Sequence, residues 1–494
     1  MYQASSRSFT ILESRIRLKC RVLCRNVLLG SGYGAQQPPW FKFGAGTSAL
    51  QIEGGWNASG NVNSFFTPKR FTLQGSQYHL TPVISSVMER VLDRGESNWD
   101  RYLHLFPKTI AGSADVTCDS YRLWRRDIQM CQELGLDMYR FSISWSRLLP
   151  TGLSNYISED GKNYYNNLIN GLLEKGIEPV VTLNHFDLPQ RLQNLGGWTN
   201  PLISNWFAEY ARVAFSLYAD RVKIWLTVNE PQILCDSGYN NGTVPYINDP
   251  KYGRYLCSKN VLLAHAKAYR IYDRHYRHLY HGKVTIVFLY LWLAPATEND
   301  IEVTNLARQY VEGRYGHPVY SKEGGWPKEL EEILANNSRN EGYPEPRLPP
   351  FTEEEKELVK GSFDFYALNH YSSLLVRKAK PGEVIGKTLV DGIEELGIVL
   401  ESDPSWEKGD IKWLTVHPEG LREQLNYLKN TYNLTEIMIT ENGFFSSNAS
   451  LNDVRTVNYT KKYLEQVALA IQDGVNVTVY FHWSLMDNFD KGYE

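Results

Sequence analysis

The sequence lacks several features that would place a protein in a common functional class. It has no excess of positive charge, because 52 lysines and arginines stand against 55 aspartates and glutamates and the net charge is −3. This balance argues against a nucleic-acid partner and against an anionic membrane surface. The longest apolar run, Val284 to Ala296, is shorter than the roughly 20 residues that span a bilayer. We therefore expect neither a nucleic-acid partner nor a membrane association.

Cysteine is also scarce, with six in 494 residues. No spacing of Cys and His suggests a metal site, and we expect no metal and no cofactor. Cys235 and Cys257 bracket a loop rich in Gly, Asn and Pro. A disulfide between them is a candidate, and two free thiols are the alternative.

The N-terminal stretch "RIRLKCRVLCRNVLLG" is positively charged but has no uninterrupted apolar run of signal-peptide length. Glycosylation sequons nevertheless favour a secreted glycoprotein in an extracellular space such as a gut lumen. There are seven of them, at Asn57, Asn241, Asn336, Asn433, Asn448, Asn458 and Asn476.

What the sequence does contain is a series of short apolar segments that alternate with amphipathic ones. The apolar segments, which we predict to be strands, are 41–50, 137–145, 178–185, 223–229, 283–291, 362–371, 436–442 and 475–483. Segments with helical spacing of apolar residues lie between them, for example 120–135, 161–176, 201–219 and 419–432. This alternation predicts an α/β protein with a single (β/α)8 TIM barrel over residues 40–494. No repeat or interdomain linker divides it.

Polar residues and tryptophans gather at the ends of seven predicted strands. They are Gln51 and Glu53, Arg140 and Trp145, Asn184 and His185, Asn229 and Glu230, Asn369 and Tyr371, Glu441 and Asn442, and Trp483. Any one of them could be structural, but in such barrels the carboxyl ends of the strands meet at one mouth, where the chemistry takes place. Two carboxylates from different strands, Glu230 and Glu441, predict glycoside hydrolysis, which needs one protonated and one ionised carboxyl group. The distance between them decides between retention and inversion.

Five motifs carry a resemblance to a known family: "TVNEP", "ITENGF", "YRFSISWSRLLP", "TLNHFDLPQRL" and "HWSLMDNF". They resemble the family 1 glycoside hydrolases, the β-glucosidase family, from about residue 40 to the end, and most of all its animal and insect members. The resemblance implies a retaining enzyme in which Glu230 is the general acid/base and Glu441 is the nucleophile. It further implies that Arg140 keeps Glu441 ionised.

The resemblance also assigns the sugar-binding residues. Gln51 and His185 would bind the glycone hydroxyls, and Asn229 would bind the 2-hydroxyl. Tyr371 would lie near the nucleophile with Asn369 close by, Trp483 would form a platform under the sugar, and Trp413 would stand at the cleft entrance. The implied partner is a small-molecule β-glucoside.

The sequence departs from the family pattern in three places. Asp490 in "DNFDKGYE" stands where the family has the glutamate that grips the outer glycone hydroxyls, which leaves glucose, galactose and fucose open. Residues 61–93 form an unusual insertion, which we interpret as an intron read in frame, with a real loop near the mouth as the alternative. The chain also ends at Glu494, before the closing eighth helix of the family. We expect the N-terminal extension, residues 1–39, to be disordered or wrongly predicted from the gene.

Three functions remain in competition. The leading hypothesis is a β-glucosidase that hydrolyses terminal β-D-glucosides. The second is a thioglucosidase (myrosinase) acting on glucosinolates. Plant thioglucosidases replace the acid/base glutamate by glutamine, so Glu230 favours O-glycosides, although animal thioglucosidases can keep the glutamate. The third is a degenerate, non-catalytic family member. The natural aglycone and the oligomeric state are left open.

Overall fold

Eight parallel strands form a closed barrel, which confirms the predicted α/β (β/α)8 architecture. The computed structural model describes residues 38–58, 94–107, 114–240, 249, 251–385, 392–446 and 452–489. Around the barrel the strands follow the order β1-β13-β12-β7-β5-β4-β3-β2. Their bounds are β1 Lys42–Gly46, β2 Met138–Ser142, β3 Glu178–Asn184, β4 Ile224–Asn229, β5 Lys283–Leu289, β7 Tyr366–Asn369, β12 Ile437–Asn442 and β13 Val477–Trp483. Each lies within a segment predicted from the sequence.

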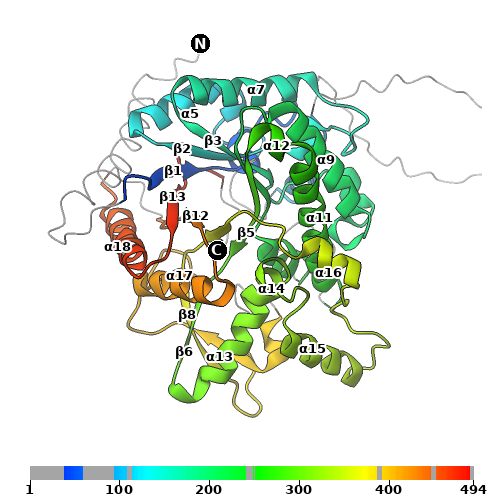
Figure 1. The fold of residues 1–494 in the computed structure, drawn as a ribbon, viewed down its shortest axis with the longest axis vertical. Helices are drawn as coiled ribbons and strands as arrows, with labels where there is room; N and C mark the ends of the chain where they lie inside the picture. The colour runs from blue at the N-terminus through cyan, green and yellow to red at the C-terminus, as the bar shows by residue number, and fades with distance from the viewer. Residues whose placement is uncertain are drawn as a thin grey trace, which may run out of the picture.

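Helices surround the barrel on its outside (Figure 1). The longer ones are α5 Ser120–Leu134, α7 Glu159–Glu174, α9 Ile203–Tyr218, α11 Gly253–His275, α15 Lys328–Asn340, α17 Pro418–Tyr432 and α18 Val454–Gln472. The short helices are α3 Ala49–Ile52, α4 Asn98–Leu105, α6 Trp145–Leu148, α8 Gln190–Asn194, α10 Gly238–Asn240, α12 Arg277–Tyr280, α13 Ile301–Arg308, α14 Arg314–Tyr320 and α16 Glu353–Val359. Single turns of 3-10 or π helix are η1 Gly197–Thr199, η2 Ile233–Ser237, η3 Glu298–Asp300, η4 Gln309–Gly313 and η5 Ile393–Leu396.

Helix α5 illustrates how the sequence sets these elements. Ile128, Cys131 and Leu134 recur at helical spacing and are buried against the barrel. The helix ends at Gly135, which adopts a left-handed conformation (φ +66°) that a residue with a side chain rarely takes. The chain can therefore turn directly into β2.

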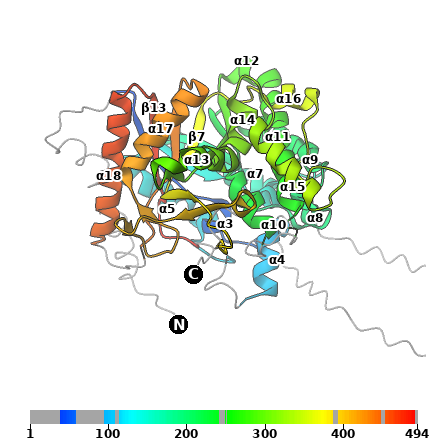
Figure 2. The same cartoon turned by 90° about the horizontal axis from the view of Figure 1, so that it is seen from below.

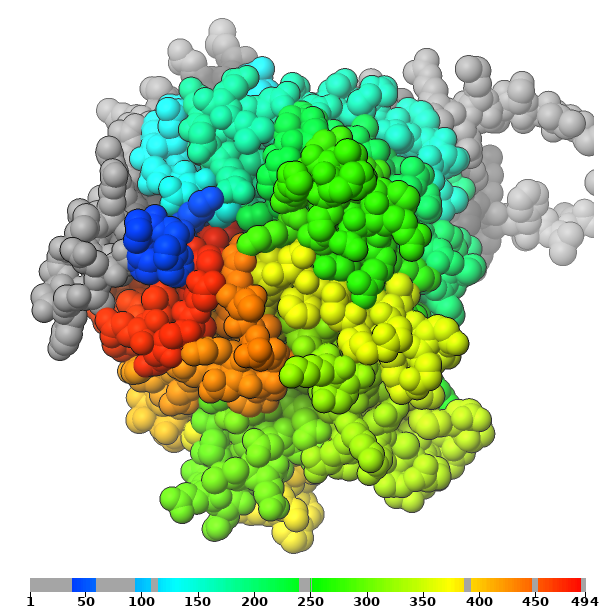
Figure 3. Space-filling model, in the orientation of Figure 1, coloured from blue at the N-terminus to red at the C-terminus, as the bar shows by residue number. Residues whose placement is uncertain are grey.

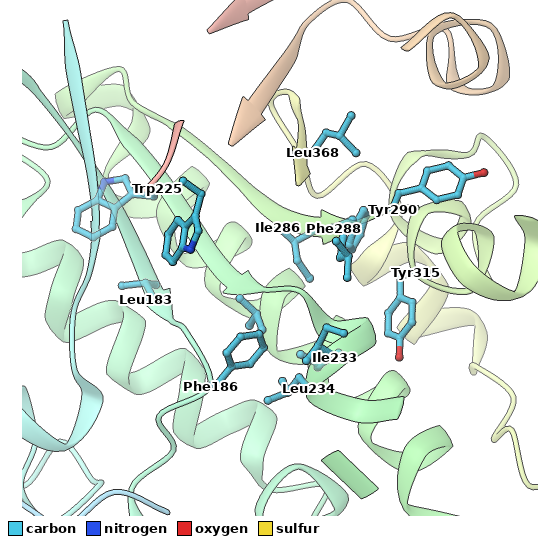
Figure 4. Close-up of a cluster of buried hydrophobic side chains, with 14 of the residues drawn as sticks. Leu183, Phe186, Trp225, Ile233, Leu234, Ile286, Phe288, Tyr290, Tyr315 and Leu368 are labelled. Atoms are coloured by element: carbon cyan, nitrogen blue, oxygen red, sulfur yellow. The ribbon is translucent and has the colours of Figure 1, made fainter. Parts of the chain in front are cut away.

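The hydrophobic core has two parts, one inside the barrel and one between the barrel and its helices. The inner part contains Met138, Val180, Ile224, Leu226, Val287, Phe365, Ala367, Met438, Val479 and Phe481. Figure 4 shows a section of the outer part, where Trp225 of β4, Phe288 of β5 and Tyr315 of α14 lie among other buried side chains. Because most strand residues are buried on both faces of the barrel, the strands read as nearly continuous apolar runs.

The barrel closes where the first strand pairs with the last. β1 runs parallel to β13, with Lys42 opposite Val479 and Gly46 opposite Trp483. At the surface, the N-terminal described residues lie against the C-terminal ones, blue beside red in Figure 3. A Cβ atom on Gly44 would lie 2.4 Å from the ring of Phe481, so this position leaves no space for a side chain.

Two small sheets were not predicted, and a helix replaces the end of one predicted strand. β6 Trp292–Pro295, β8 Ser373–Lys378 and β9 Ile398–Glu401 form a three-stranded sheet, and β10 Glu407–Lys408 pairs with β11 Thr415–Val416. The predicted first strand, 41–50, was too long, because the chain leaves the barrel after Gly46 and forms α3. Figure 2 shows α3, α4 and α10 along one edge of the molecule, to which the carboxyl ends of β1 and β4 lead.

Several predictions concern residues that the structure does not describe. The extension 1–39 lies outside the described residues except for Pro38 and Pro39, and so do the insertion 61–93 and Asp490. Among the described helices, none has the length and apolar character needed to cross a membrane.

Candidate active site

Two buried carboxylates lie at the carboxyl end of the barrel. Glu230 follows β4 directly and is 8% exposed, and Glu441 lies within β12 and is 3% exposed. The register of the neighbouring strands shifts at both places, after Leu226 in β4 and after Ile439 in β12. Such irregularities redirect side chains at the rim of a barrel.

The backbone at Glu230 explains why an apolar strand ends on a carboxylate followed by proline. Glu230 has a φ of +46°, and its N–H still donates to Val287 O of the next strand (2.9 Å). Its own carbonyl then accepts from Leu234 N (3.0 Å), so a helical turn begins at Pro231. Proline suits the first position of a helix, where its missing N–H is not needed. The strand thus changes into a helix at the residue that presents the carboxyl group.

Glu441 is held by a cation and a hydroxyl group. Arg140 Nη1 donates to its Oε1 (2.6 Å), and Tyr371 O–H donates to its Oε2 (2.6 Å). Burial, followed by the charges of Glu441 and Glu230, raises the pKa of Tyr371 well above its ordinary value. Tyr371 therefore remains a donor, so Arg140 and Tyr371 each donate a hydrogen bond to one carboxylate oxygen of Glu441.

Glu230 has a different kind of neighbour. Asn369 Nδ2 donates to its Oε1 (2.8 Å) and also lies 3.2 Å from Asn229 Oδ1. Asn229 Oδ1 in turn accepts from Arg140 Nη2 (2.7 Å). Asn229 and Asn369 are fully buried, so these amides link the two carboxylates through Arg140.

Of the other predicted site residues, His185, Trp483 and Trp413 contact members of this group, whereas Gln51 contacts Asn488. The rings of His185 and Trp483 stack, 5.3 Å apart, and His185 Nε2 is 3.3 Å from Asn229 Nδ2. Gln51, on α3, donates to Asn488 Oδ1 (3.3 Å). Trp413 is half-buried and meets the Tyr371 ring edge-on at 5.9 Å. The position of Asp490 is not described.

Three further residues belong to the site but were not predicted. Thr182 Oγ1 accepts from Arg140 Nε (3.2 Å), and Thr440 Oγ1 donates to Asn369 Oδ1 (2.7 Å). Phe445 packs against Tyr371 and Trp413. A signal was available for Thr440, because it directly precedes Glu441 at the polar end of β12; for Phe445 there was none.

Cys235 and Cys257 form a disulfide with an S–S distance of 2.04 Å. It joins η2, the turn that follows Glu230, to α11. The covalent link therefore holds the segment that follows Glu230 against helix α11 of the outer layer.

Comparison with known proteins decides the family. The sequence model described as Glycosyl hydrolase family 1 matches residues 92–494. The chain belongs to this family.

Relatives within family 1 cover nearly the whole chain. Myrosinase 1 of Brevicoryne brassicae is 38% identical over 464 residues, which are 92% of this chain and 91% of the relative. The cytosolic β-glucosidase of Homo sapiens is 36% identical over 470 residues, again 92% and 91%.

A solved family 1 structure also has the same fold. A rice β-glucosidase mutant in a covalent complex with Glc matches with a TM-score of 0.77 and 31% identity, covering 96% of this chain and 93% of that one. The relatives thus include both β-glucosidases and a myrosinase.

Proposed function

We propose that the protein is a retaining β-glucosidase with Glu230 as acid/base and Glu441 as nucleophile. In the first step Glu441 attacks the anomeric carbon while Glu230 gives its proton to the glycosidic oxygen. The bond between that oxygen and the anomeric carbon breaks, and its electron pair stays on the leaving alcohol. A covalent ester between the sugar and Glu441 remains.

In the second step a water molecule attacks the same carbon from the face that the alcohol left. Glu230, now ionised, accepts a proton from this water. The ester bond breaks, its electron pair returns to Glu441, and glucose leaves with its β configuration retained. Gln51, His185, Asn229 and Trp483 would bind the glycone, and Trp413 with Phe445 would contact the aglycone.

One observation carries this proposal: a cation and a hydroxyl group donate to Glu441, whereas an amide donates to Glu230. Glu441 accepts from the cation Arg140 and from Tyr371, as an ionised nucleophile requires. Glu230 has a neutral amide at its Oε1, which is compatible with a group that must be protonated and ionised in turn. The covalent complex that the rice relative forms with Glc is consistent with a glycosyl-enzyme.

A trapping experiment tests the assignment. We expect a 2-deoxy-2-fluoro-β-glucoside with a good leaving group to add one glycosyl mass, which maps to Glu441. The Glu441→Gln variant should take up no label, and Glu230→Gln should still take it up, because a good leaving group needs no proton. Folded protein without label, or with label elsewhere, would refute the assignment and support the non-catalytic alternative or another glycone.

The thioglucosidase is a second candidate because the relative that is 38% identical is a myrosinase. Glu230 favours O-glycosides, since a thiol leaving group needs no acid. We expect kcat/KM to be higher for an aryl O-β-glucoside than for allyl glucosinolate. The reverse order would establish the thioglucosidase.

We further propose that the protein enters the secretory pathway, as its disulfide and sequons suggest. Asn433 is one suitable acceptor: it is exposed, at the left-handed end of α17 (φ +51°). The test is expression of the full chain in insect cells, followed by glycosidase F in H2¹⁸O and peptide mass mapping. We expect ¹⁸O-labelled aspartate at position 433, and its absence from secreted protein would refute this glycan.

A further inference from the structure

Arg140 fixes the orientation of the first amide in the site. A guanidinium group has only donors, and Nη2 of Arg140 lies 2.7 Å from one end of the Asn229 amide. That end must be the oxygen, Oδ1. The nitrogen of Asn229 consequently faces the other way, toward His185 Nε2 at 3.3 Å.

The contact with Asn229 determines the orientation of the Asn369 amide. One end of the Asn369 amide lies 3.2 Å from Asn229 Oδ1, which is an acceptor, so this end must be the donor Nδ2. The other end, Oδ1, then accepts from the hydroxyl of Thr440 at 2.7 Å. Asn369 is fully buried between these two contacts. The contact with Asn229 sets the orientation, and the Thr440 hydroxyl, which can donate or accept, matches it by donating.

The orientation of the Asn369 amide in turn determines which kind of group contacts Glu230. The same Nδ2 of Asn369 lies 2.8 Å from Glu230 Oε1. Because an amide nitrogen can only donate, Oε1 is an acceptor whether Glu230 is protonated or ionised. We infer that Asn369, held by Asn229 and Thr440, confines the acid proton of Glu230 to Oε2.

This inference rests on the proposed role of Glu230 and makes Asn369 and Thr440 positioning residues. In the first step the Oε2–H bond breaks, the proton goes to the glycosidic oxygen, and that oxygen keeps the electron pair of its bond to carbon. In the second step Oε2 takes the proton of water. Oε1 takes part in neither transfer, although the two oxygens of a free carboxyl group are equivalent.

The Asn369→Asp variant tests the inference, because it keeps the shape of the side chain and replaces the donor by an oxygen. The acid proton is then attracted to Oε1 and away from the leaving group. We expect kcat/KM for an alkyl β-glucoside to fall about 100-fold or more, the lower range of general acid catalysis. For 2,4-dinitrophenyl β-glucoside, whose leaving group needs no proton, we expect a loss several-fold smaller. The alkaline limb of the kcat/KM profile should also move to higher pH.

Asn442→Asp is the matched control. Asn442 is a fully buried amide on β12, and it contacts His370 O, Tyr459 and Tyr480. Any loss in this variant should be equal for the two substrates. Equal losses in Asn369→Asp would overturn the inference.

Thr440 provides a second test if Asn369→Asp does not fold. Thr440→Val removes the hydroxyl at nearly constant shape, and Thr440→Ser retains it. We expect Thr440→Val to lower kcat/KM for the alkyl glucoside about 5-fold, which is the worth of one hydrogen bond. Its kcat/KM for the dinitrophenyl glucoside should stay nearly unchanged. Thr440→Ser should have nearly the wild-type kcat/KM for the alkyl glucoside. A Thr440→Ser variant as impaired as Thr440→Val would contradict the inference. Wild-type protein that hydrolyses neither substrate would instead refute the role of Glu230 itself.

Discussion

Arg140 is the central hydrogen-bond donor of the site. Its guanidinium donates to Glu441 and Asn229, and also to Thr182 Oγ1 and to the carbonyl of Thr440 (3.0 Å). These acceptors come from three strands, β3, β4 and β12, so Arg140 ties their ends together across the barrel. A lysine has one compact ammonium group and could not reach acceptors in so many directions.

Tyr371→Phe should impair the nucleophile without unfolding the protein. The change removes the hydrogen bond to Glu441 Oε2 and keeps the ring that packs on Trp413 and Phe445. A hydrogen bond to a charged group is worth about 1.5–3 kcal/mol, so we expect kcat/KM to fall about 10- to 100-fold. Steady-state kinetics with an aryl glucoside measures this.

Tyr290→Phe is the control for that prediction. Tyr290 is also fully buried, but its hydroxyl has no hydrogen-bond partner within the described part of the chain. We expect its kinetics to match the wild type. A similar loss of activity in both variants would mean that Tyr371 acts through packing alone.

At the level of elements, the π-helical turn η4 brings a carboxyl group into the protein interior. Glu312 is 1% exposed and accepts from Tyr366 O–H of β7 (3.1 Å) and from Tyr432 O–H of α17 (2.7 Å). Its burial raises its pKa from 4.5 to about 7. The group joins three elements, but only neutral hydroxyls compensate its charge.

Glu312→Gln should therefore stabilise the protein at alkaline pH. Because the folded state holds the proton more tightly, the contribution of Glu312 to stability is fully present below about pH 4.5 and is lost as pH rises through about 7. We expect the variant to be more stable by about 1–3 kcal/mol at pH 8, and the difference to shrink toward pH 5. Urea unfolding at both pH values measures it.

Glu353→Gln serves as the control for the pH effect. Its side chain is 82% exposed and pairs with Lys356 on the surface of α16. It should change stability by less than about 0.5 kcal/mol at either pH. A difference for Glu312→Gln that grows toward acid pH would contradict the assignment.

The disulfide is the other device that acts between elements. It closes a loop with a sequence separation of 22 between η2 and α11. Replacing both Cys235 and Cys257 by serine should lower the free energy of unfolding by about 3 kcal/mol. Chemical denaturation with and without reductant checks this, and reductant should affect only the wild type. Equal stability of the variant and the oxidised wild type would show that the link is dispensable.

The eight barrel strands were predictable because each is an apolar run between amphipathic helices. The sheet β6-β8-β9 was not, because β6 begins directly after the segment predicted as the fifth strand and β8 ends in the charged residues Arg377 and Lys378. The residues of the mouth could be identified from strand ends alone. Their contacts could not, since the distances among Arg140, Asn229 and Asn369 depend on the register of β2, β4 and β7, which no local pattern specifies.

For the molecule as a whole, the contact that closes the barrel is the pairing of β1 with β13, which joins the two ends of the described chain. Gly44→Ala should disturb it, because the new Cβ would lie 2.4 Å from Phe481 inside the barrel. Overpacking of this kind costs about 1–3 kcal/mol. Thermal unfolding should show a single transition at a lower temperature, because loss of closure affects the entire barrel.

Gly313→Ala is the matched comparison for the closure. Its Cβ would lie 3.2 Å from Pro327 Cγ in the outer helix layer, far enough for a small adjustment. We expect a change well below that of Gly44→Ala. If the two variants lost stability equally, the closure would not be the sensitive point of the fold.

The lack of any acceptor on Arg140 has a consequence for entropy. A cluster of amides and hydroxyls usually has several arrangements of its protons with similar energies, and only a fraction of the molecules then holds the reactive one. That fraction multiplies the rate, as for any minor state. Here one donor-only group in the centre removes the degeneracy. Every substrate molecule would meet the same microstate, and none of its binding energy would be needed to select it.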